Sequence, residues 1–198
     1  DRDRRHAFAS GHAANLWRNC KPASANHPYL VAKGIRPQGL RQSAGALLVP
    51  LRTIDGDLVN IQRIAPDGTK RFLRGGRVWQ VFHIVGAKSI TGASSLYIAE
   101  GIATACTASE ALGVPVIAAL NAGNLTPVAK ALRTRFPLLE IVIAADNDWR
   151  TSGNPGITKA REVAAAVNGA VTWPSVCMKE DCTCTDFNDL ERCRRSKS

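Results

Sequence analysis

The chain has 198 residues, of which 45% are hydrophobic and 21% charged, and its formal net charge is +10. It is long enough to bury a core, but no apolar run approaches the ~20 residues that cross a bilayer, and its start lacks the apolar core of a signal peptide. We therefore expect a cytoplasmic protein. The positive charge favours a polyanionic partner, nucleic acid first, with a solvated basic surface as the alternative.

The first half of the chain predicts a small lobe of mixed structure. A helix is expected over residues 5–19, with Phe8, Leu16 and Trp17 as apolar contacts, and a helical turn over 29–33. The apolar segments 46–51 and 58–64 lie on either side of an Asp-Gly pair and predict a β-hairpin.

A basic segment with an aromatic residue and two glycines follows the hairpin. Cations beside an aromatic ring and flexible glycines suit contact with a sugar-phosphate backbone. A solvated edge strand is the alternative interpretation. The segment is Lys70-Arg71-Phe72-Leu73-Arg74-Gly75-Gly76-Arg77.

From about residue 95 the pattern alternates between strands and helices. Such alternation predicts a doubly wound parallel sheet with helices on its faces. We therefore expect a basic α+β lobe over residues 1–92 and an α/β domain over 93–198. The predicted strands are 96–99, 116–120, 141–145 and 170–173, and the predicted helices are 102–112, 156–167 and 126–136, the last capped by Thr126 with Pro127 in its first turn.

Carboxylates stand at the ends of two predicted strands. Glu100 follows the first apolar run, and Asp146 and Asp148 follow the third. Parallel strands deliver their carboxyl ends to the sheet edge where ligands bind. Grouped carboxylates repel one another and are tolerated mainly where a divalent cation compensates their charge, usually Mg2+. The sequence therefore predicts metal-assisted chemistry on phosphates.

Four of the six cysteines fall near the end of the chain. Their spacing differs from the paired C-x2-C of zinc ribbons and fingers, so free thiols are expected, although four thiolates in one short stretch can also ligate zinc. These residues are Cys177, Cys182, Cys184 and Cys193.

Three acidic stations carry a family resemblance. Glu100-Gly101, Asp146-Asn147-Asp148 and Asp186-Phe187-Asn188-Asp189 resemble, in this order, the Toprim domain of primases, topoisomerases and some nucleases. The basic segment 70–77 and the small-residue loop 120–126 are similar to features of plasmid and phage primases. The resemblance implies a Toprim-like parallel sheet flanked by helices, preceded by the smaller basic lobe.

The resemblance also implies roles for individual residues. Asp146, Asp148 and Asp186 would hold Mg2+ or Mn2+, with Asp189 close behind, and Glu100 would be the general acid/base or help to bind a metal. A helix cap is the alternative for Asp186. The expected nucleotide and template contacts are Lys70, Arg71, Arg74, Arg77, Lys88 and Asn124.

The expected function is that of a DNA primase catalytic core, which makes RNA primers on single-stranded DNA from NTPs by Mg2+-dependent nucleotidyl transfer. A metal-dependent nuclease with the same carboxylates and an inactive nucleic-acid binding module are the alternatives. The sequence begins without Met, so we expect a piece of a longer replication protein with a helicase or other replication domain as partner.

Overall fold

The computed structural model describes residues 1–177, 179 and 182–195. The chain divides into two compact units, Asp1–His83 and Ile84–Ser198. The division falls before the expected boundary at residue 92, because β6 (His83–Val85) belongs to the second sheet. Among the described residues, every helix is too short or too polar to span a bilayer.

The first unit is an antiparallel sheet with two helices. Its strands pair in chain order, and β3 and β4 form the predicted hairpin, with Leu47 opposite Ile64. The basic strand β5 lies at the sheet edge. The helices are α1 (Arg2–Asn19) and α2 (Pro28–Lys33), and the strands are β1 (Lys21–Pro22), β2 (Arg41–Ser43), β3 (Ala46–Arg52), β4 (Leu58–Ile64) and β5 (Lys70–Phe72).

The buried stripe of α1 differs from the prediction. Ala9 and Ala13 are buried, and Ala13 packs against Leu48 and Ile61 of the sheet, whereas Phe8 is 81% exposed. Residues four apart share one helix face, and two alanines on that face let the helix backbone approach the strands closely. The expectation that Phe8 packs in the core was therefore wrong.

The second unit is an α/β domain, as predicted. Its sheet has the order β10-β9-β7-β8-β6, and the pairs β10–β9, β9–β7 and β7–β8 are parallel. The strands are β6, β7 (Ser95–Ala99), β8 (Val116–Ala118), β9 (Glu140–Ala144) and β10 (Ala170–Thr172).

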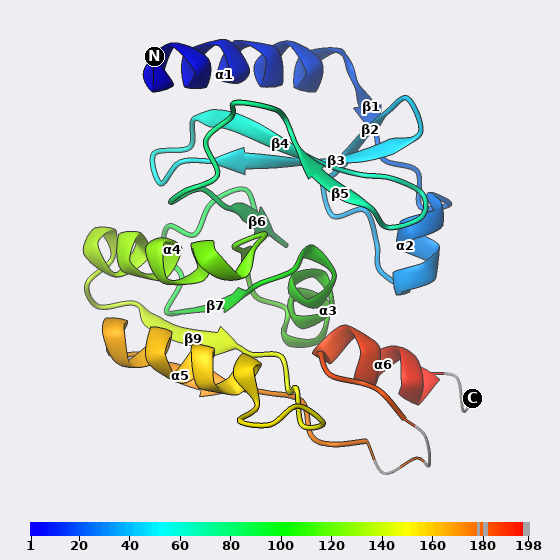
Figure 1. Ribbon diagram of the computed structural model, residues 1–198, viewed down its shortest axis with the longest axis vertical. Coiled ribbons are helices and arrows are strands. Elements are labelled where there is room, and N and C mark those ends of the chain that lie inside the picture. The colour runs from blue at the N-terminus through cyan, green and yellow to red at the C-terminus, as the bar shows by residue number, and fades with distance from the viewer. Residues whose placement is uncertain (178, 180–181, 196–198) are drawn as a thin grey trace. The chain divides into compact units, whose positions relative to one another are not determined.

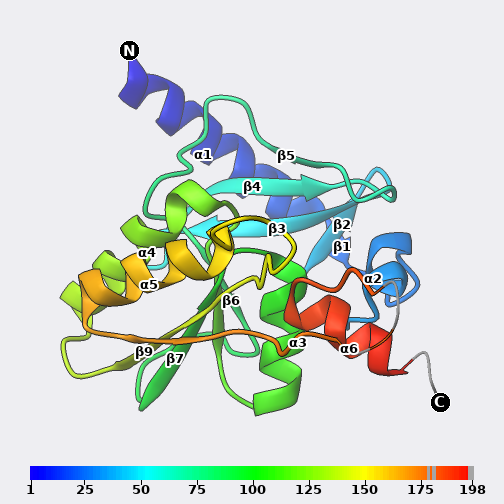
Figure 2. The same ribbon diagram turned by 60° about the horizontal axis from the view of Figure 1, so that its bottom comes forward.

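Helices of the second unit pack in two pairs. Helix α3 contacts α6, and α4 contacts α5 (Figures 1 and 2). From β7 the chain passes through α3 to β8 on one side, whereas β9 pairs with the other side of β7. The order of the strands thus reverses between β7 and β9, the position at which open α/β sheets bind ligands. The helices are α3 (Ile102–Leu112), α4 (Ala122–Arg135), α5 (Pro155–Val167) and α6 (Phe187–Arg195).

Helix α4 begins earlier than predicted. Its N-cap position is Asn121, so Pro127 lies inside the helix rather than in its first turn. A proline there lacks the N–H that would bond to the Gly123 carbonyl, so the helix loses one backbone hydrogen bond in its second turn. The prediction that Thr126 caps this helix was therefore wrong.

Candidate active site

Glu100 and Asp146 leave neighbouring parallel strands at the same edge. Ala99 of β7 lies opposite Ala144 of β9, so Glu100 follows one strand directly and Asp146 follows the other two positions later. Both strands are buried runs of apolar residues, which fixes their register and the direction in which they deliver the carboxylates. The edge lies at the reversal of strand order between β7 and β9.

One pocket joins three of the predicted carboxylates. It has a volume of about 270 Å³ and is lined by Glu100, Asp146 and Asp148, together with the start of α5. Lys159 of α5 also lines it, and its Nζ lies 3.1 Å from Glu162 Oε2 on the exposed helix surface. The structure thus brings the two acidic strand ends together beside one cation that the sequence analysis did not identify.

The start of α5 holds Asp148 in place. Gly156 N donates to Asp148 Oδ2 at 2.9 Å, and Asp148 N donates to Asn154 Oδ1 at 2.9 Å. Asn154 occupies the N-cap position of α5 with Pro155 as the first helical residue. A carboxylate facing backbone N–H groups at a helix N-terminus is electrostatically favourable. The pattern Asn-Pro-Gly after the acidic trio was the sequence signal for this anchor.

Gly156 is required by close approach to the acidic loop. A Cβ at this position would lie 2.3 Å from the Asp146 carbonyl oxygen and 2.9 Å from Asp148 Oδ2. Because the first of these atoms belongs to the backbone, a larger residue would push the loop away from α5. The glycine therefore sets the distance between the helix and the two aspartates.

Asn147 anchors the same loop to the interior. Its side chain is buried, and Nδ2 donates to the Pro174 carbonyl at 2.8 Å. Its Oδ1 accepts from Asn154 Nδ2 at 2.8 Å, and its backbone N–H donates to Thr185 O at 2.6 Å. The middle residue of the trio thus points inward while the aspartates on either side line the pocket.

Asp186 stands at the start of α6, as the helix-cap interpretation expected. Its Oδ1 accepts from Asp189 N at 2.7 Å. The helix is tied to α3 by Asn188, which is 1% exposed and donates from Nδ2 to Thr107 Oγ1 at 2.9 Å. The cap does not remove Asp186 from the acidic group, because its charge still acts on Asp146.

The acidic group makes Asp146 hard to ionise. Burial raises the pKa of Asp146 from 3.8 to about 7, and the charges of Asp186, Glu100, Asp148 and Asp189 add to this rise in that order of importance. Desolvation and like charge both disfavour the carboxylate form. A bound cation would reverse this effect, so the pocket is suited to hold positive charge.

The predicted nucleotide contacts fall into different environments. Lys70, Arg71 and Arg74 are exposed on the first unit, and Lys88 is exposed on the second. Asn124 is only 2% exposed, and its Nδ2 donates to Ala119 O at 2.9 Å. Its burial suits a residue that holds the loop before α4 better than one that contacts a nucleotide directly.

The basic segment is anchored by Asn60 of β4. This side chain is fully buried and donates from Nδ2 to Arg77 O at 3.1 Å. A Cβ on Gly76 would lie 2.4 Å from the Asn60 amide, which explains the second glycine of the segment. Arg77 itself donates from Nε to Trp79 O at 2.7 Å. The fold therefore presents the exposed cations from a fixed backbone.

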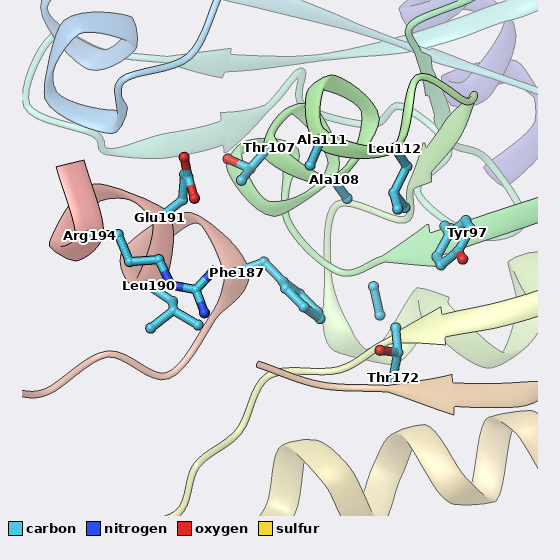
Figure 3. Close-up of a pocket in the computed structure, with 11 residues that line it drawn as sticks. Tyr97, Thr107, Ala108, Ala111, Leu112, Thr172, Phe187, Leu190, Glu191 and Arg194 are labelled. Atoms are coloured by element: carbon cyan, nitrogen blue, oxygen red, sulfur yellow. The ribbon is translucent and has the colours of Figure 1, made fainter. Parts of the chain in front are cut away.

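A second pocket in this unit, of about 230 Å³, contains none of the predicted site residues. Residues of α3, including Ala108 and Leu112, face Phe187 and Leu190 of α6 across it (Figure 3). Its lining is mostly apolar and holds no group of carboxylates, so the acidic pocket remains the candidate for chemistry.

Comparison with known families agrees with the geometry of the acidic pocket. The family model of the Toprim domain matches residues 95–196, a range that includes Glu100, Asp146, Asp148 and Asp186. The chain belongs to the Toprim-domain family. The matched range covers every strand and helix described for the second sheet and its helices except β6, which does not line the pocket.

Two curated relatives of this Toprim chain are named DNA primase TraC, both from Escherichia coli. One is 38% identical over 187 residues, 88% of this chain and 17% of the relative, and the other is 38% identical over 161 residues, 77% of this chain and 11% of the relative. The chain thus spans less than a fifth of the length of these relatives.

Solved structures of primases share the fold. The primase fragment of the bacteriophage T7 primase-helicase protein has a TM-score of 0.61 at 16% identity and covers 85% of this chain and 70% of its own. The DnaG primase catalytic domain bound to ssDNA has a TM-score of 0.60 at 10% identity and covers 98% of this chain and 80% of its own. The match to the DnaG domain extends over both units.

Proposed function

We propose that this chain is the catalytic core of a DNA primase, which joins NTPs into an RNA primer on single-stranded DNA. The observation that carries the proposal is the single pocket lined by Glu100, Asp146 and Asp148. The names of the two TraC relatives and the shared fold of the T7 and DnaG primases support the same activity.

The donor set of the pocket fits Mg2+ or Mn2+. Hard divalent cations prefer carboxylate oxygens. Burial and the charges of neighbouring carboxylates raise the pKa of Asp146, and a bound cation would offset both effects. In this proposal Asp146 and Asp148 hold the metal, Asp186 completes the acidic group, and Asp189 adds charge at its rim. When bound, Mg2+ would activate the primer 3′ hydroxyl and stabilise charge on the leaving pyrophosphate.

In this proposal, residues in and beside the pocket orient the metal ligands and the substrate. Gly156 N donates to the Asp148 carboxylate and Asn154 Oδ1 accepts from Asp148 N, so the Asp148 side chain is held in one orientation before substrate binds. Glu100 lines the same pocket and acts as the general acid/base or as a further metal ligand. Lys159, in the same lining, offers a positive charge to a triphosphate.

The basic segment supplies contacts with nucleic acid and nucleotides. Lys70, Arg71 and Arg74 are exposed on and after the edge strand β5, with Arg77 beside them, and Lys88 adds an exposed cation in the second unit. Side chains on an edge strand can follow a phosphate backbone, and cations there neutralise phosphate charge. We assign these residues to template and triphosphate contacts.

The partners follow from the same proposal. Single-stranded DNA and NTPs are the substrates. A helicase or other replication domain acts with the chain, by analogy with the T7 protein, which is named a primase-helicase protein. A replication enzyme of plasmid or phage type works in the cytoplasm.

A primer-synthesis assay tests the proposal. The protein is incubated with single-stranded DNA, labelled NTPs and Mg2+, beside Asp146→Ala and Glu140→Gln. Glu140 stands at the opposite end of the same strand as Asp146 and is exposed, so its variant controls for the loss of an acidic residue. Template-dependent oligonucleotides from the parent and from Glu140→Gln, but not from Asp146→Ala, are expected.

Two other outcomes would overturn it. Shortened DNA without new synthesis, lost in Asp146→Ala, would assign a nuclease that uses the same carboxylates on water. Binding of single-stranded DNA without either product would assign an inactive binding module.

A further inference from the structure

A second group of possible metal ligands lies outside the acidic pocket. The sulfur atoms of Cys177, Cys182 and Cys193 all lie within 4.8 Å of one another. Cys193 Sγ lies 3.8 Å from Cys177 Sγ and 3.8 Å from Cys182 Sγ. Cys184 Sγ joins the group at 3.0 Å from Cys182 Sγ. Three thiols therefore converge, and the fourth lies beside one of them.

The group is assembled by the fold rather than by a short motif. Three of the cysteines lie between β10 and α6 in the chain, and Cys193 lies on α6 itself. None of these four described cysteines forms a disulfide, and all four are partly buried. Their spacing along the chain favoured unpaired thiols, whereas their positions in space favour a shared ligand.

We propose that Cys177, Cys182, Cys184 and Cys193 bind one structural zinc ion. Thiolates about 2.3 Å from a tetrahedral zinc ion lie about 3.8 Å from one another, which matches both separations from Cys193. A disulfide requires about 2.05 Å. The Cys182–Cys184 pair, at 3.0 Å, is closer than a tetrahedral edge, so these two thiolates separate slightly on binding.

The surroundings compensate the charge of such a centre. Zinc with four thiolates carries a net charge of −2. Lys179 and Arg194 line a hollow together with Cys177 and Cys193, and Arg192 lines another with Cys184 and Cys193. Positive side chains around a thiolate centre favour the deprotonated ligands that zinc needs.

The zinc ion would hold the segment that carries Asp186 against the loop that carries Asp146 and Asp148. Cys184 precedes Asp186 by two positions and Cys193 lies later on α6, so the ligands enclose Asp186 in the chain. Trp149 Nε1 donates to Cys184 O at 3.2 Å, and Arg150 donates to Cys182 O at 2.7 Å. Zinc would thereby fix the segment before α6 against the loop that carries Asp148.

Metal analysis of the full chain tests this inference. The reduced protein is titrated with Zn2+ and, separately, with Co2+, whose tetrahedral thiolate complexes absorb strongly in the visible range. One zinc ion per chain is expected. Cys177→Ser and Cys193→Ser should weaken zinc binding by at least about 100-fold, because each removes one of four ligands, and Cys184→Ser should also weaken it.

Matched variants separate this centre from the acidic pocket. Cys20→Ser removes a partly buried thiol of the first unit, and Asp146→Ala removes a carboxylate of the acidic pocket. Both should keep one zinc ion with unchanged affinity. Loss of primer synthesis in Asp146→Ala with full zinc content would show that the two centres are distinct.

Thiol protection in the unaltered protein tests the centre even if the serine variants do not fold. Zinc should protect four thiols from alkylation, and mass spectrometry should assign them to the four cysteines. A stoichiometric disulfide among these residues, protection of none of them, or zinc binding unchanged in Cys177→Ser and Cys193→Ser would overturn the proposal.

Discussion

Asp146 carries a strong electrostatic conflict in the acidic pocket. Its carboxyl is largely buried and faces the charges of Asp186, Glu100, Asp148 and Asp189, which together with burial raise its pKa from 3.8 to about 7. A residue placed for ligand binding often costs stability in this way. The conflict is a property of one side chain and can be measured as such.

The metal-free protein should therefore lose stability as pH rises. The raised pKa of Asp146 gives stability that is present below pH 3.8 and lost as pH rises through about 7. With metal removed by EDTA, Asp146→Asn should be more stable than the parent at pH 8 by on the order of 2 kcal/mol, and by less at pH 5. Thermal unfolding at both pH values measures this.

The control for this experiment is Glu140→Gln, which neutralises an exposed acidic residue at the other end of β9. It should unfold like the parent at both pH values. An Asp146→Asn protein no more stable than the parent at pH 8 would contradict the electrostatic account of the pocket.

His83 should make the protein less stable as pH falls, the opposite of the pH dependence expected from Asp146. Burial, helped by the positive charge of Arg52, lowers its pKa from 6.5 to about 4, against the effect of the Pro50 carbonyl that bonds to the ring. Its Nε2 is buried without a hydrogen-bond partner among the described residues. The stability that it contributes is present above pH 6.5 and lost as pH falls through about 4.

Urea unfolding of His83→Gln at pH 4.5 and 7.5 checks this. The variant should lose less stability on acidification than the parent, by on the order of 2 kcal/mol. His12→Gln, a change at an exposed histidine, should keep the parent's loss. Equal losses in His83→Gln and the parent would show that His83 does not titrate as its burial requires.

At the scale of single residues, the sequence predicted the carboxylates better than their supports. Glu100, Asp146 and Asp148 could be found because each ends or follows an apolar strand. The inward role of Asn147 depends on its hydrogen bond to the Pro174 carbonyl. Asn154 caps α5 by accepting from Ile157 N, and the same oxygen accepts from Asp148 N. The pattern of apolar residues carries no information about such contacts. The sequence also does not distinguish Lys159 from other lysines on exposed helix surfaces.

Helix α6 is the element that brings the third acidic station to the site. It packs against α3, and Asn188 donates to Thr107 Oγ1 at 2.9 Å in a buried position. A hydrogen bond of this kind contributes about 1 kcal/mol, and breaking one partner leaves the other buried and unsatisfied. The position of Asp186 and Asp189 depends on this contact.

A double-mutant cycle should detect the contact between the two helices. Asn188→Ala and Thr107→Val should each destabilise the protein by about 1 to 3 kcal/mol, and the double variant should be more stable than the sum predicts, by about 1 kcal/mol. Chemical denaturation of the four proteins measures the coupling. Additive losses would show that the hydrogen bond does not join α3 and α6.

At the scale of elements, periodicity located most strands and helices but missed some of their ends. Helix α3 spans the predicted residues 102–112. Helix α4 starts at Ala122, because the general preference for proline at a helix start was overridden by the small residues before it. Helix α1 buries alanines instead of Phe8, because close approach to the sheet outweighed side-chain size.

At the scale of the whole molecule, the net charge of +10 belongs almost entirely to the first unit, which carries +9, whereas the second unit carries +1. The exposed cations Arg71 and Arg74 stand out because they lie on and after the edge strand β5, where a nucleic acid can approach. Charge alone predicts attraction to any polyanion. The positions of individual cations on the fold are needed to distinguish a binding surface from the attraction that the net charge exerts on any polyanion.

Replacement of Arg71 and Arg74 by Gln should weaken binding to single-stranded DNA. The slope of log K against log salt should also become less steep, by about 0.7 for each phosphate that the variant no longer neutralises. The matched control is the double change of Arg2 and Arg4 to Gln, which removes the same charge from the exposed start of α1. Fluorescence anisotropy at several salt concentrations measures both quantities.

The control should bind more tightly than the Arg71 and Arg74 variant. Equal loss of affinity in the two double variants would mean that DNA senses only the net charge of the protein, and the assignment of the basic segment to template contacts would fail.

The most direct test of a metal site in the acidic pocket is a Mn2+ titration at pH 8 monitored by electron paramagnetic resonance. The proteins compared are the parent, Asp146→Asn, Asp148→Asn and Glu140→Gln. If the acidic pocket is a divalent metal site, the parent and Glu140→Gln should bind Mn2+ with the same affinity, and each aspartate variant should bind it at least about 10-fold more weakly. Unchanged Mn2+ binding in both aspartate variants would contradict the claim that Glu100, Asp146 and Asp148 form a metal-binding active site.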